Sequence, residues 1–318
     1  MPSNANTSPR KLTIIVVILA FISISVSAKM SSTTNSLVIA TRLHLGHASH
    51  PPPPSQLFET LSCFAQLAST VGADHAIVAV DAEEKLEGYN LIEEVTKICK
   101  TLNGGDTDNS EIDKPAPLHS LIHVLPVTPW GKFVPALNAI VIWSAQNKAR
   151  YLLIASAEVQ LTEEVMDVMK NKMDLDRTLV VGTVLQGHEY KNSKDGEEEV
   201  EVELTGRTTP WNTCALWNVP KLALTGFLLV SEGLHPEEDG REGSGGVEEV
   251  CTIATLQQIL QPKNAQAKLI SIPGTSWGQD FSNDEKRREW HERKMLSKCT
   301  RAKRQLDLLG LSGTVIHC

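Results

Sequence analysis

Short apolar runs and longer segments with helical spacing alternate through the first half of the chain. Apolar runs without helical periodicity predict strands, and the segments between them place apolar residues three or four positions apart, as helices do. The predicted strands are residues 37–41, 75–80, 120–125, 151–155 and 178–185, and the predicted helices are residues 56–70, 90–102, 133–147 and 163–172. This alternation indicates an α/β fold with a mainly parallel central sheet, flanked by helices and buried on both faces.

The alternation stops near Thr208. From there the pattern predicts loop, helix, loop and helix, then a strand at residues 268–272 and a charged terminal helix at residues 283–308. No internal repeat is evident in the sequence. We interpret this part as one α/β domain whose second half serves a substrate rather than the sheet.

The N-terminal residues have the features of a signal peptide. Arg10 and Lys11 precede an apolar run, residues 12–26, and small residues at 26–28 allow cleavage after Ala28. At 1.5 Å per residue the run spans about 22 Å, short of the roughly 30 Å hydrocarbon core of a bilayer. An uncleaved signal anchor is the alternative, and either form places the body in the lumen of the endoplasmic reticulum or Golgi, or outside the cell. The predicted organisation is a signal peptide at 1–28, a linker at 29–35 and the domain at 36–318.

Composition narrows the classes of partner. The formal net charge of −8 argues against a nucleic-acid-binding surface, which is normally basic. Much of the acidity lies in residues 195–203 and 232–242, which we interpret as solvated loops. The six cysteines lack metal-ligand spacing, so structural zinc is not expected, although an oxidising compartment allows one or two disulfides. Cys63, Cys99 and Cys251 fall within apolar helical patterns and are expected to be buried free thiols.

Polar side chains follow two of the predicted parallel strands. Asp81 ends the second strand, and Ser156, Ala157 and Glu158 follow the fourth. Because open α/β sheets bind ligands at the carboxyl ends of their strands, these residues are expected at the mouth of one crevice.

Four short segments then carry a resemblance to a known family. They are Gly131-Lys132 leading to Ala136-Leu137-Asn138, residues 151–158, Trp211-Asn212 leading to Gly226-Phe227, and Gly246-Val247-Glu248-Glu249. In this order and spacing, over roughly residues 36–270, the chain resembles the nucleotide-sugar-binding core of GT-A glycosyltransferases, particularly the family 2-like enzymes. The resemblance implies a transferase of the hexosyltransferase class, with a nucleotide-diphosphate sugar as donor and a glycan or other hydroxyl compound as acceptor.

The resemblance assigns Asp81, Lys132 and Asn138 to the donor site. It implies that Asp81 lies against the nucleotide, that Lys132 meets phosphate, and that Asn138 binds the nucleotide or fixes a neighbouring strand. From the residues alone, Asp81 is equally well a turn or helix-cap residue. For residues 131–138, the alternative is an ordinary loop followed by a helix.

One part of the family pattern is altered. Where the family has Asp-x-Asp after the fourth strand, this chain has Ser156 and Glu158, both assigned to the donor site. Glu158 is therefore the remaining acid for Mn²⁺ or Mg²⁺, together with phosphate oxygens of the donor. The resemblance also implies His291 as a metal ligand. His291 shares a cationic helix face with Lys298 and Arg301, which is either solvated or directed at phosphate.

The last two segments are assigned to the acceptor and to catalysis. Trp211 and Asn212 offer an aromatic face for a sugar ring and an amide for its hydroxyls, while packing in the core is the alternative for a tryptophan. Glu249 is implied as the general base, with Glu248 as the alternate. Acids also favour the first turn of a helix for electrostatic reasons alone.

Two other functions remain open at this level. The first is a catalytically inactive relative that binds a glycan or a partner, which Ser156 at the metal position favours. The second is a nucleotidyltransferase, which is disfavoured because residues 41–46 lack the glycine-rich, arginine-containing loop expected after the first strand. Contact with a membrane is expected only through the N-terminal segment, if that segment is not cleaved.

Overall fold

The computed structural model describes residues 36–45, 50–83, 85–86, 88–104, 121–192, 199–233, 247–277 and 285–318. Within residues 285–296 it describes the side chains of Glu289, Arg293 and Met295 alone. These parts belong to one compact unit, Asn35–Cys318. The predicted leader lies outside the described residues and stays a prediction. No helix in the described ranges is both long enough and apolar enough to cross a membrane.

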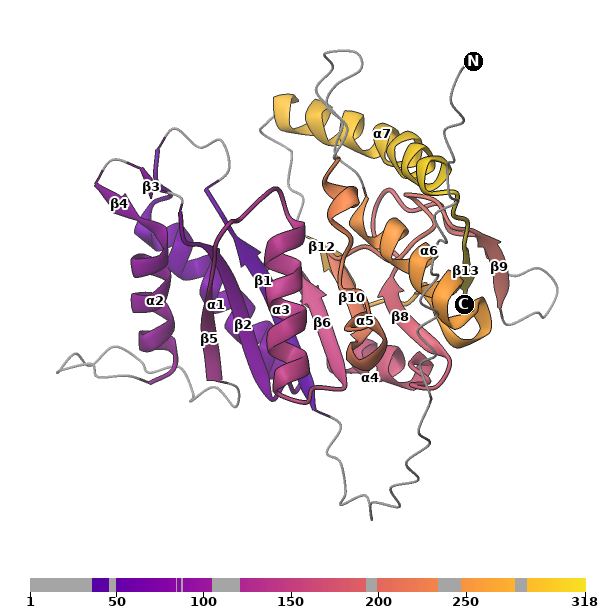
Figure 1. Ribbon diagram of the computed structural model, residues 1–318. Coiled ribbons are helices and arrows are strands. Elements are labelled where there is room, and N and C mark those ends of the chain that lie inside the picture. The colour runs from indigo at the N-terminus through magenta and orange to yellow at the C-terminus, as the bar shows by residue number, and fades with distance from the viewer. Residues whose placement is uncertain are drawn as a thin grey trace, which may run out of the picture. The chain divides into compact units, whose positions relative to one another are not determined.

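One nine-stranded sheet dominates the unit, in the order β5-β2-β1-β6-β10-β8-β11-β13-β9 (Figure 1). Its strands are β1 (Leu37–Leu43), β2 (His75–Asp81), β5 (Leu121–Val127), β6 (Tyr151–Ala155), β8 (Thr178–Thr183), β9 (Val200–Glu203), β10 (Cys214–Asn218), β11 (Gln266–Ile270) and β13 (Thr314–His317). β10 is antiparallel to both of its neighbours and β9 is antiparallel to β13, while the other pairs are parallel. The mainly parallel central sheet predicted from the sequence is confirmed.

Helices cover both faces of this sheet. They are α1 (Pro54–Thr70), α2 (Leu91–Leu102), α3 (Val134–Gln146), α4 (Glu163–Lys172), α5 (Val219–Leu222), α6 (Glu248–Leu260) and α7 (Glu285–Leu309). Two short 3₁₀ helices, η1 (Leu229–Glu232) and η2 (Pro262–Asn264), and two small antiparallel strand pairs complete the described elements. The pairs are β3 (Lys85–Leu86) with β4 (Tyr89–Asn90), and β7 (Val159–Leu161) with β12 (Thr275–Trp277).

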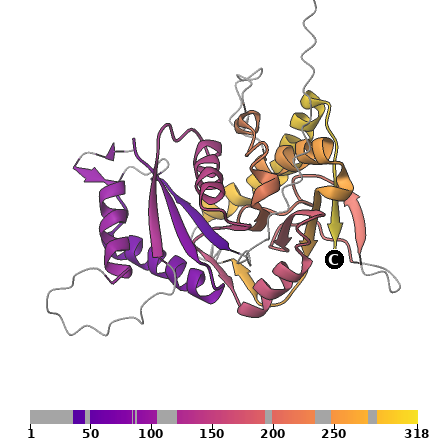
Figure 2. The ribbon, with the colours of Figure 1, turned by 60° about the horizontal axis from the view of Figure 1, so that its bottom comes forward.

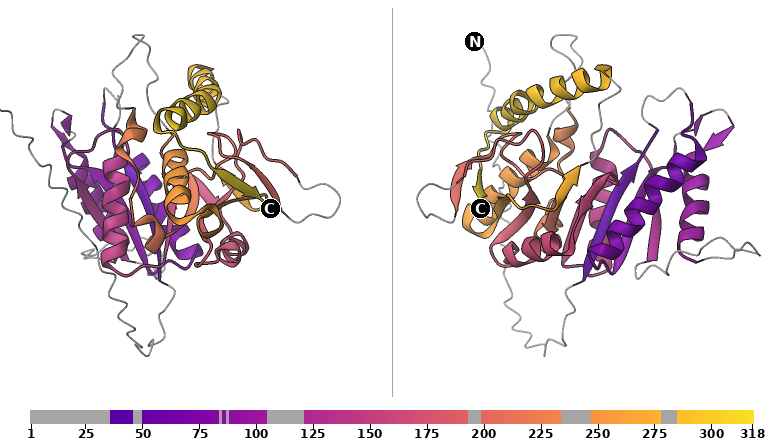
Figure 3. Two further views of the ribbon diagram at one scale, coloured as in Figure 1. Left: turned by 45° about the vertical axis from the view of Figure 1, so that its right-hand side comes forward. Right: turned by 180° about the vertical axis from the view of Figure 1, so that it is seen from behind.

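The central strands are largely apolar because alternate side chains enter two different cores. In β1, Leu37 and Ile39 pack in the core that α1, α2 and α4 supply. Val38 and Ala40 point the other way, into the core that α3, α5 and α6 supply. Figure 2 shows the sheet between these two layers, and the right-hand view of Figure 3 shows α1 lying across the face opposite α3. A continuous apolar run is what burial on both faces requires.

Two expectations about the second half of the chain are wrong. The stretch after Thr208 was expected to leave the sheet, yet Cys214–Asn218 forms β10, a fully buried central strand between β6 and β8. Antiparallel pairing with strands far away in the sequence decides this position, and the local pattern does not reveal it. Residues 200–203, which were interpreted as part of a solvated loop, form β9, which pairs with β13 at one edge of the same sheet.

The cysteines are partly as expected. Cys99 and Cys251 are buried free thiols, and burial raises the pKa of each to about 12. Cys63 is exposed, because its position on α1 faces away from the core that Leu61 and Phe64 enter. Its predicted burial is therefore wrong.

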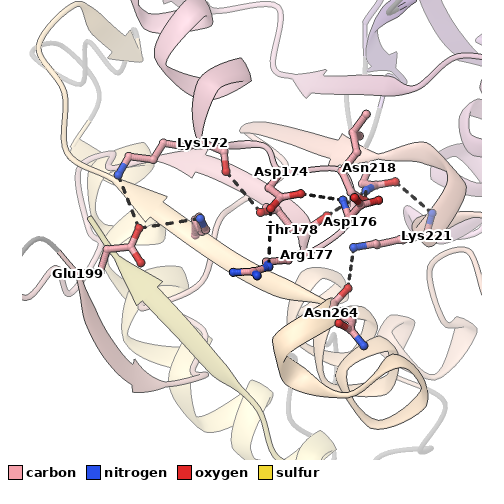
Figure 4. A network of polar contacts seen from close by, with 11 residues as sticks. Lys172, Asp174, Asp176, Arg177, Thr178, Glu199, Asn218, Lys221 and Asn264 are labelled. Atoms are coloured by element: carbon pink, nitrogen blue, oxygen red, sulfur yellow. Dashed lines mark hydrogen bonds and ion pairs between the residues drawn. The ribbon is translucent and has the colours of Figure 1, made fainter. Parts of the chain in front are cut away.

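A polar network ties β8, β10 and α5 together at the end of the sheet where β8 begins (Figure 4). The Asn218 amide nitrogen donates to the carbonyl oxygens of Leu175 at 2.9 Å and Thr178 at 3.0 Å. Its side-chain oxygen accepts from the backbone nitrogen of Lys221 at 3.3 Å, and the Lys221 ammonium donates to the Asn264 carbonyl at 2.6 Å. Asn218 is thus a structural residue, and the network holds the carboxyl end of β10 against the start of β8 and against α5.

Candidate functional site

A cleft with a volume of about 470 Å³ lies at the carboxyl ends of β1 and β6. The parallel strands β1 and β6 are neighbours, and the antiparallel β10 begins beside the end of β6, so chain segments distant in sequence meet here. The residues that line the cleft and bear on its chemistry are Arg42, Phe133, Ser156, Glu158, Asn212, Thr213, Glu248, Glu249, Trp277, Lys298 and Arg301.

Glu249 is the buried acid of the cleft. It lies in the first turn of α6, is only 4% exposed, and accepts a hydrogen bond from the backbone nitrogen of Asn212 at 2.6 Å. Burial raises the pKa of Glu249 to about 7, and the neighbouring Glu248 adds to this rise, while Lys298 and the bond from Asn212 oppose it. A carboxyl group with this pKa exchanges its proton near neutral pH, which suits a general base.

Asn212 is held in a fixed orientation beside Glu249. Its side-chain oxygen accepts a hydrogen bond from the indole nitrogen of Trp217 at 2.9 Å. Its amide nitrogen is buried and has no hydrogen-bond partner within the described ranges. Because an unpaired buried donor costs about 1–3 kcal/mol, a ligand oxygen that reached this nitrogen would recover that energy.

Three cationic side chains enter the cleft from two elements. Arg42, at the end of β1, donates to the Phe133 carbonyl at 3.2 Å. Lys298 and Arg301 lie three residues apart on α7, with the Lys298 ammonium 3.6 Å from the centroid of the Trp211 ring. Burial lowers the pKa of Arg301, while Glu248 and Glu249 act in the opposite direction. The cations thus face the acids of α6 across one cleft.

Ser156 and Glu158 lie at the cleft, as the strand-end rule predicts. The Ser156 hydroxyl accepts a hydrogen bond of 3.5 Å from the backbone nitrogen of Glu158, so it shapes the turn after β6. Glu158 is exposed. In the part of the chain that the structure describes, no three His, Cys, Asp or Glu side chains come together as a metal-binding group. The His291 side chain lies outside that part, so Glu158 is the predicted metal ligand that the structure describes at the cleft.

Two residues predicted in the donor site, Asn138 and Asp81, make hydrogen bonds to the backbone. The Asn138 side chain pairs with the backbone of Phe227 in both directions, accepting at 2.7 Å and donating at 2.9 Å. Gly226 before it has φ +64°, and a Cβ there would lie 2.6 Å from the Asn138 oxygen. Asp81 accepts from the backbone nitrogen of Glu83 at 2.9 Å, as a turn residue does. Neither Asn138 nor Asp81 lines the cleft as the structure describes it.

Lys132 does not meet the cleft either, and the amides beside it are already occupied. The Glu232 carboxylate accepts from the backbone nitrogens of Lys132 at 3.1 Å, Phe133 at 2.8 Å and Val134 at 2.6 Å. Glu232 thus caps the start of α3, which corrects its interpretation as part of a solvated loop.

Trp211 is not available to a sugar ring. The residue is 1% exposed, its ring stacks on His188 with centroids 3.6 Å apart, and its indole nitrogen donates to the Gly206 carbonyl at 2.9 Å. Lys298 covers the ring from α7. The structure therefore packs Trp211 in the core, as the alternative interpretation expects, whereas Asn212 beside it lines the cleft.

Arg42 was missed at the sequence level. The available signal was its position directly after the buried part of β1, where the strand-end rule places ligand-facing residues. The cationic face of α7 was visible from spacing, and Lys298 and Arg301 are its described members at the cleft.

Comparisons with known proteins give fold-level likenesses. No family model and no curated protein matches the chain. The chain is similar in structure to a mannosyltransferase of Pyrobaculum calidifontis in complex with GDP-Man and Mn²⁺, with 11% identity and a TM-score of 0.49 over 85% of this chain and 64% of that one. It is similar to TarS of S. aureus in complex with UDP-GlcNAc, with 12% identity and a TM-score of 0.41 over 78% and 61% of the two chains.

A third likeness is to 4-diphosphocytidyl-2C-methyl-D-erythritol synthase of Anaerococcus prevotii, with 10% identity and a TM-score of 0.37 over 75% of this chain and 86% of that one. The chain spans less than two thirds of the mannosyltransferase chain and of the TarS chain. At these identities and scores the likenesses assign no activity to it.

Proposed function

We propose that this protein is a glycosyltransferase that moves a sugar from a nucleotide-diphosphate donor to a hydroxyl acceptor. The observation that carries the proposal is Glu249, a buried carboxyl group with a pKa near 7 at the strand-end cleft. The order of sequence segments that resembles GT-A enzymes supports the same activity, because the resemblance implies a general base at this position.

In the proposed reaction, the acceptor hydroxyl oxygen forms a bond to the anomeric carbon of the donor sugar. The bond from that carbon to the diphosphate oxygen breaks, and the nucleoside diphosphate leaves. Glu249 takes the hydroxyl proton, which a base with a pKa near the working pH does efficiently. The Asn212 amide nitrogen donates to a ligand oxygen in the same cleft.

Donor binding is the first test. A panel of UDP- and GDP-sugars is screened by thermal unfolding and then by calorimetry, because a ligand at about 100 times its Kd stabilises the folded state by about 2.7 kcal/mol. Asn212→Ala should weaken binding about 10-fold through loss of the amide donor. Asn147→Ala, on an exposed asparagine after α3, is the matched control. The proposal fails if no nucleotide sugar binds, or if both variants bind like the wild type.

An inactive binding protein is the second candidate. The replacement of the first acid of the family pattern by Ser156, which lies at the cleft, favours it. Such a protein would bind the nucleotide sugar or a glycan at the cleft and transfer nothing, so a turnover measurement separates the two candidates.

A further inference from the structure

The cleft differs from the expected family pattern because cationic side chains lie where a metal ion was expected to supply positive charge. A divalent ion was expected to hold the diphosphate, yet Ser156 stands in place of the first acid of the family pattern, and Glu158 is the predicted metal ligand that the structure describes at the cleft. Three cationic side chains, Arg42, Lys298 and Arg301, line the same cleft. We propose that these three side chains bind the diphosphate directly and that the cleft takes this ligand without a divalent ion. The assignment to a nucleotide sugar's diphosphate rests on the proposed function.

The positions of the three cations are fixed by the fold. Arg42 leaves the end of β1 and is held by the Phe133 carbonyl at 3.2 Å. Lys298 rests on the buried Trp211 ring, 3.6 Å from its centroid, which orders a side chain that would otherwise be flexible. Arg301 follows three residues later on α7, so both residues lie on the same helix face. This face is anchored by Ala302, which is 0% exposed, and by Gln305, which bonds to Val247 before α6.

These groups suit phosphate oxygens. A guanidinium group presents several N–H donors in a planar fork that matches phosphate, and an ammonium adds a compact charge. Glu248 and Glu249 also face these cations, and of the two Glu249 is partly protonated near neutral pH because burial raises its pKa to about 7. The Asn212 amide nitrogen, without a partner within the described ranges, adds a neutral donor. Arg42, Lys298 and Arg301 can therefore neutralise a diphosphate leaving group, which is the work expected of the metal.

The test uses inorganic pyrophosphate as the probe, titrated into the full chain by calorimetry in EDTA and again with Mn²⁺. The wild type should bind in EDTA with a Kd within about 3-fold of the value with Mn²⁺. Arg301→Gln should weaken this binding by about 10-fold or more, because it removes charge-assisted hydrogen bonds. Arg293→Gln, on an exposed arginine of the same helix, is the matched control and should bind like the wild type.

A second pair of variants guards against misfolding. Arg301→Lys keeps the charge and should retain part of the affinity, and Lys298→Met keeps the apolar stem on Trp211 and should lose affinity. The proposal is overturned if pyrophosphate binds only with Mn²⁺, if it does not bind at all, or if Arg301→Gln binds like Arg293→Gln. Pyrophosphate binding in EDTA without binding of any nucleotide sugar would uphold the clamp and reject the proposed function. Sugar transfer that depends strictly on Mn²⁺ would uphold the proposed function and reject metal-free binding by the three cations.

Discussion

Glu249→Gln should change how the stability of this protein depends on pH. The ordinary pKa of the group is 4.5, and in the folded chain burial raises it to about 7. Below about pH 4.5 Glu249 is protonated in both the folded and the unfolded chain, and its ionisation does not lower the free energy of unfolding. As the pH rises toward 7 the unfolded chain ionises first, so stability is lost, and above about pH 7 the loss is complete.

The size of the effect follows from the shift. Each pKa unit corresponds to 1.36 kcal/mol, so a rise from 4.5 to about 7 corresponds to about 3 kcal/mol, of which about 2–3 kcal/mol develops between pH 5 and pH 8. Glutamine cannot ionise, yet its oxygen can still accept the hydrogen bond from the Asn212 backbone. The free energy of unfolding of Glu249→Gln should therefore rise relative to wild type by this amount between the two pH values.

Urea unfolding, followed by tryptophan fluorescence at pH 5 and pH 8, measures the difference directly. Glu201→Gln, on an exposed residue of β9, is the control and should show no such change. If the stability difference between Glu249→Gln and wild type is the same at both pH values, Glu249 is not a buried carboxyl group with a raised pKa.

Other predictions concern Asn138, Glu232 and the N-terminal leader. Asn138→Ala should lower the free energy of unfolding by about 2 kcal/mol, because it leaves the Phe227 backbone without both bonds, while nucleotide-sugar affinity stays at the wild-type value in calorimetry. Glu232→Ala should cost about 1–2 kcal/mol in urea unfolding, because three backbone nitrogens at the start of α3 lose their acceptor; an unchanged midpoint would refute this role. If the leader is cleaved, N-terminal sequencing of the protein after export should begin at Lys29, and recovery of residues 12–26 would favour an anchor.

The sheet and its helices could be predicted because each element carries its own periodic signal. Strands β1, β2, β5, β6 and β8 are continuous apolar runs, and their helices show apolar faces, so their ends agree with the structure to within a few residues. β10 lacked such a signal. Its five residues, Cys214–Asn218, hold an apolar run of four residues, too short to distinguish a strand from a helix, and their burial depends on β6 and β8, which are distant in the sequence.

The candidate site was predictable in outline and not in its details. Position after a parallel strand correctly brought Ser156 and Glu158 to the cleft. Residue type alone could not show which way Asn138 and Trp211 face, since their partners are Phe227 and His188, on other segments. The sequence also could not show which of Glu248 and Glu249 is buried. Only the packing of α6 against its neighbours buries Glu249 and leaves Glu248 more accessible.

The central claim is that Glu249 takes a proton from an acceptor hydroxyl during sugar transfer. The most direct measurement is release of nucleoside diphosphate from the donors that bind, with a panel of glycan acceptors, for wild type and Glu249→Gln. The wild type should turn over, and Glu249→Gln should lower kcat by about 10²- to 10⁴-fold while its donor Kd stays within a few-fold of the wild-type value. A Glu249→Gln variant with near-wild-type kcat, or a wild type that binds donors and transfers to no acceptor, would contradict the account.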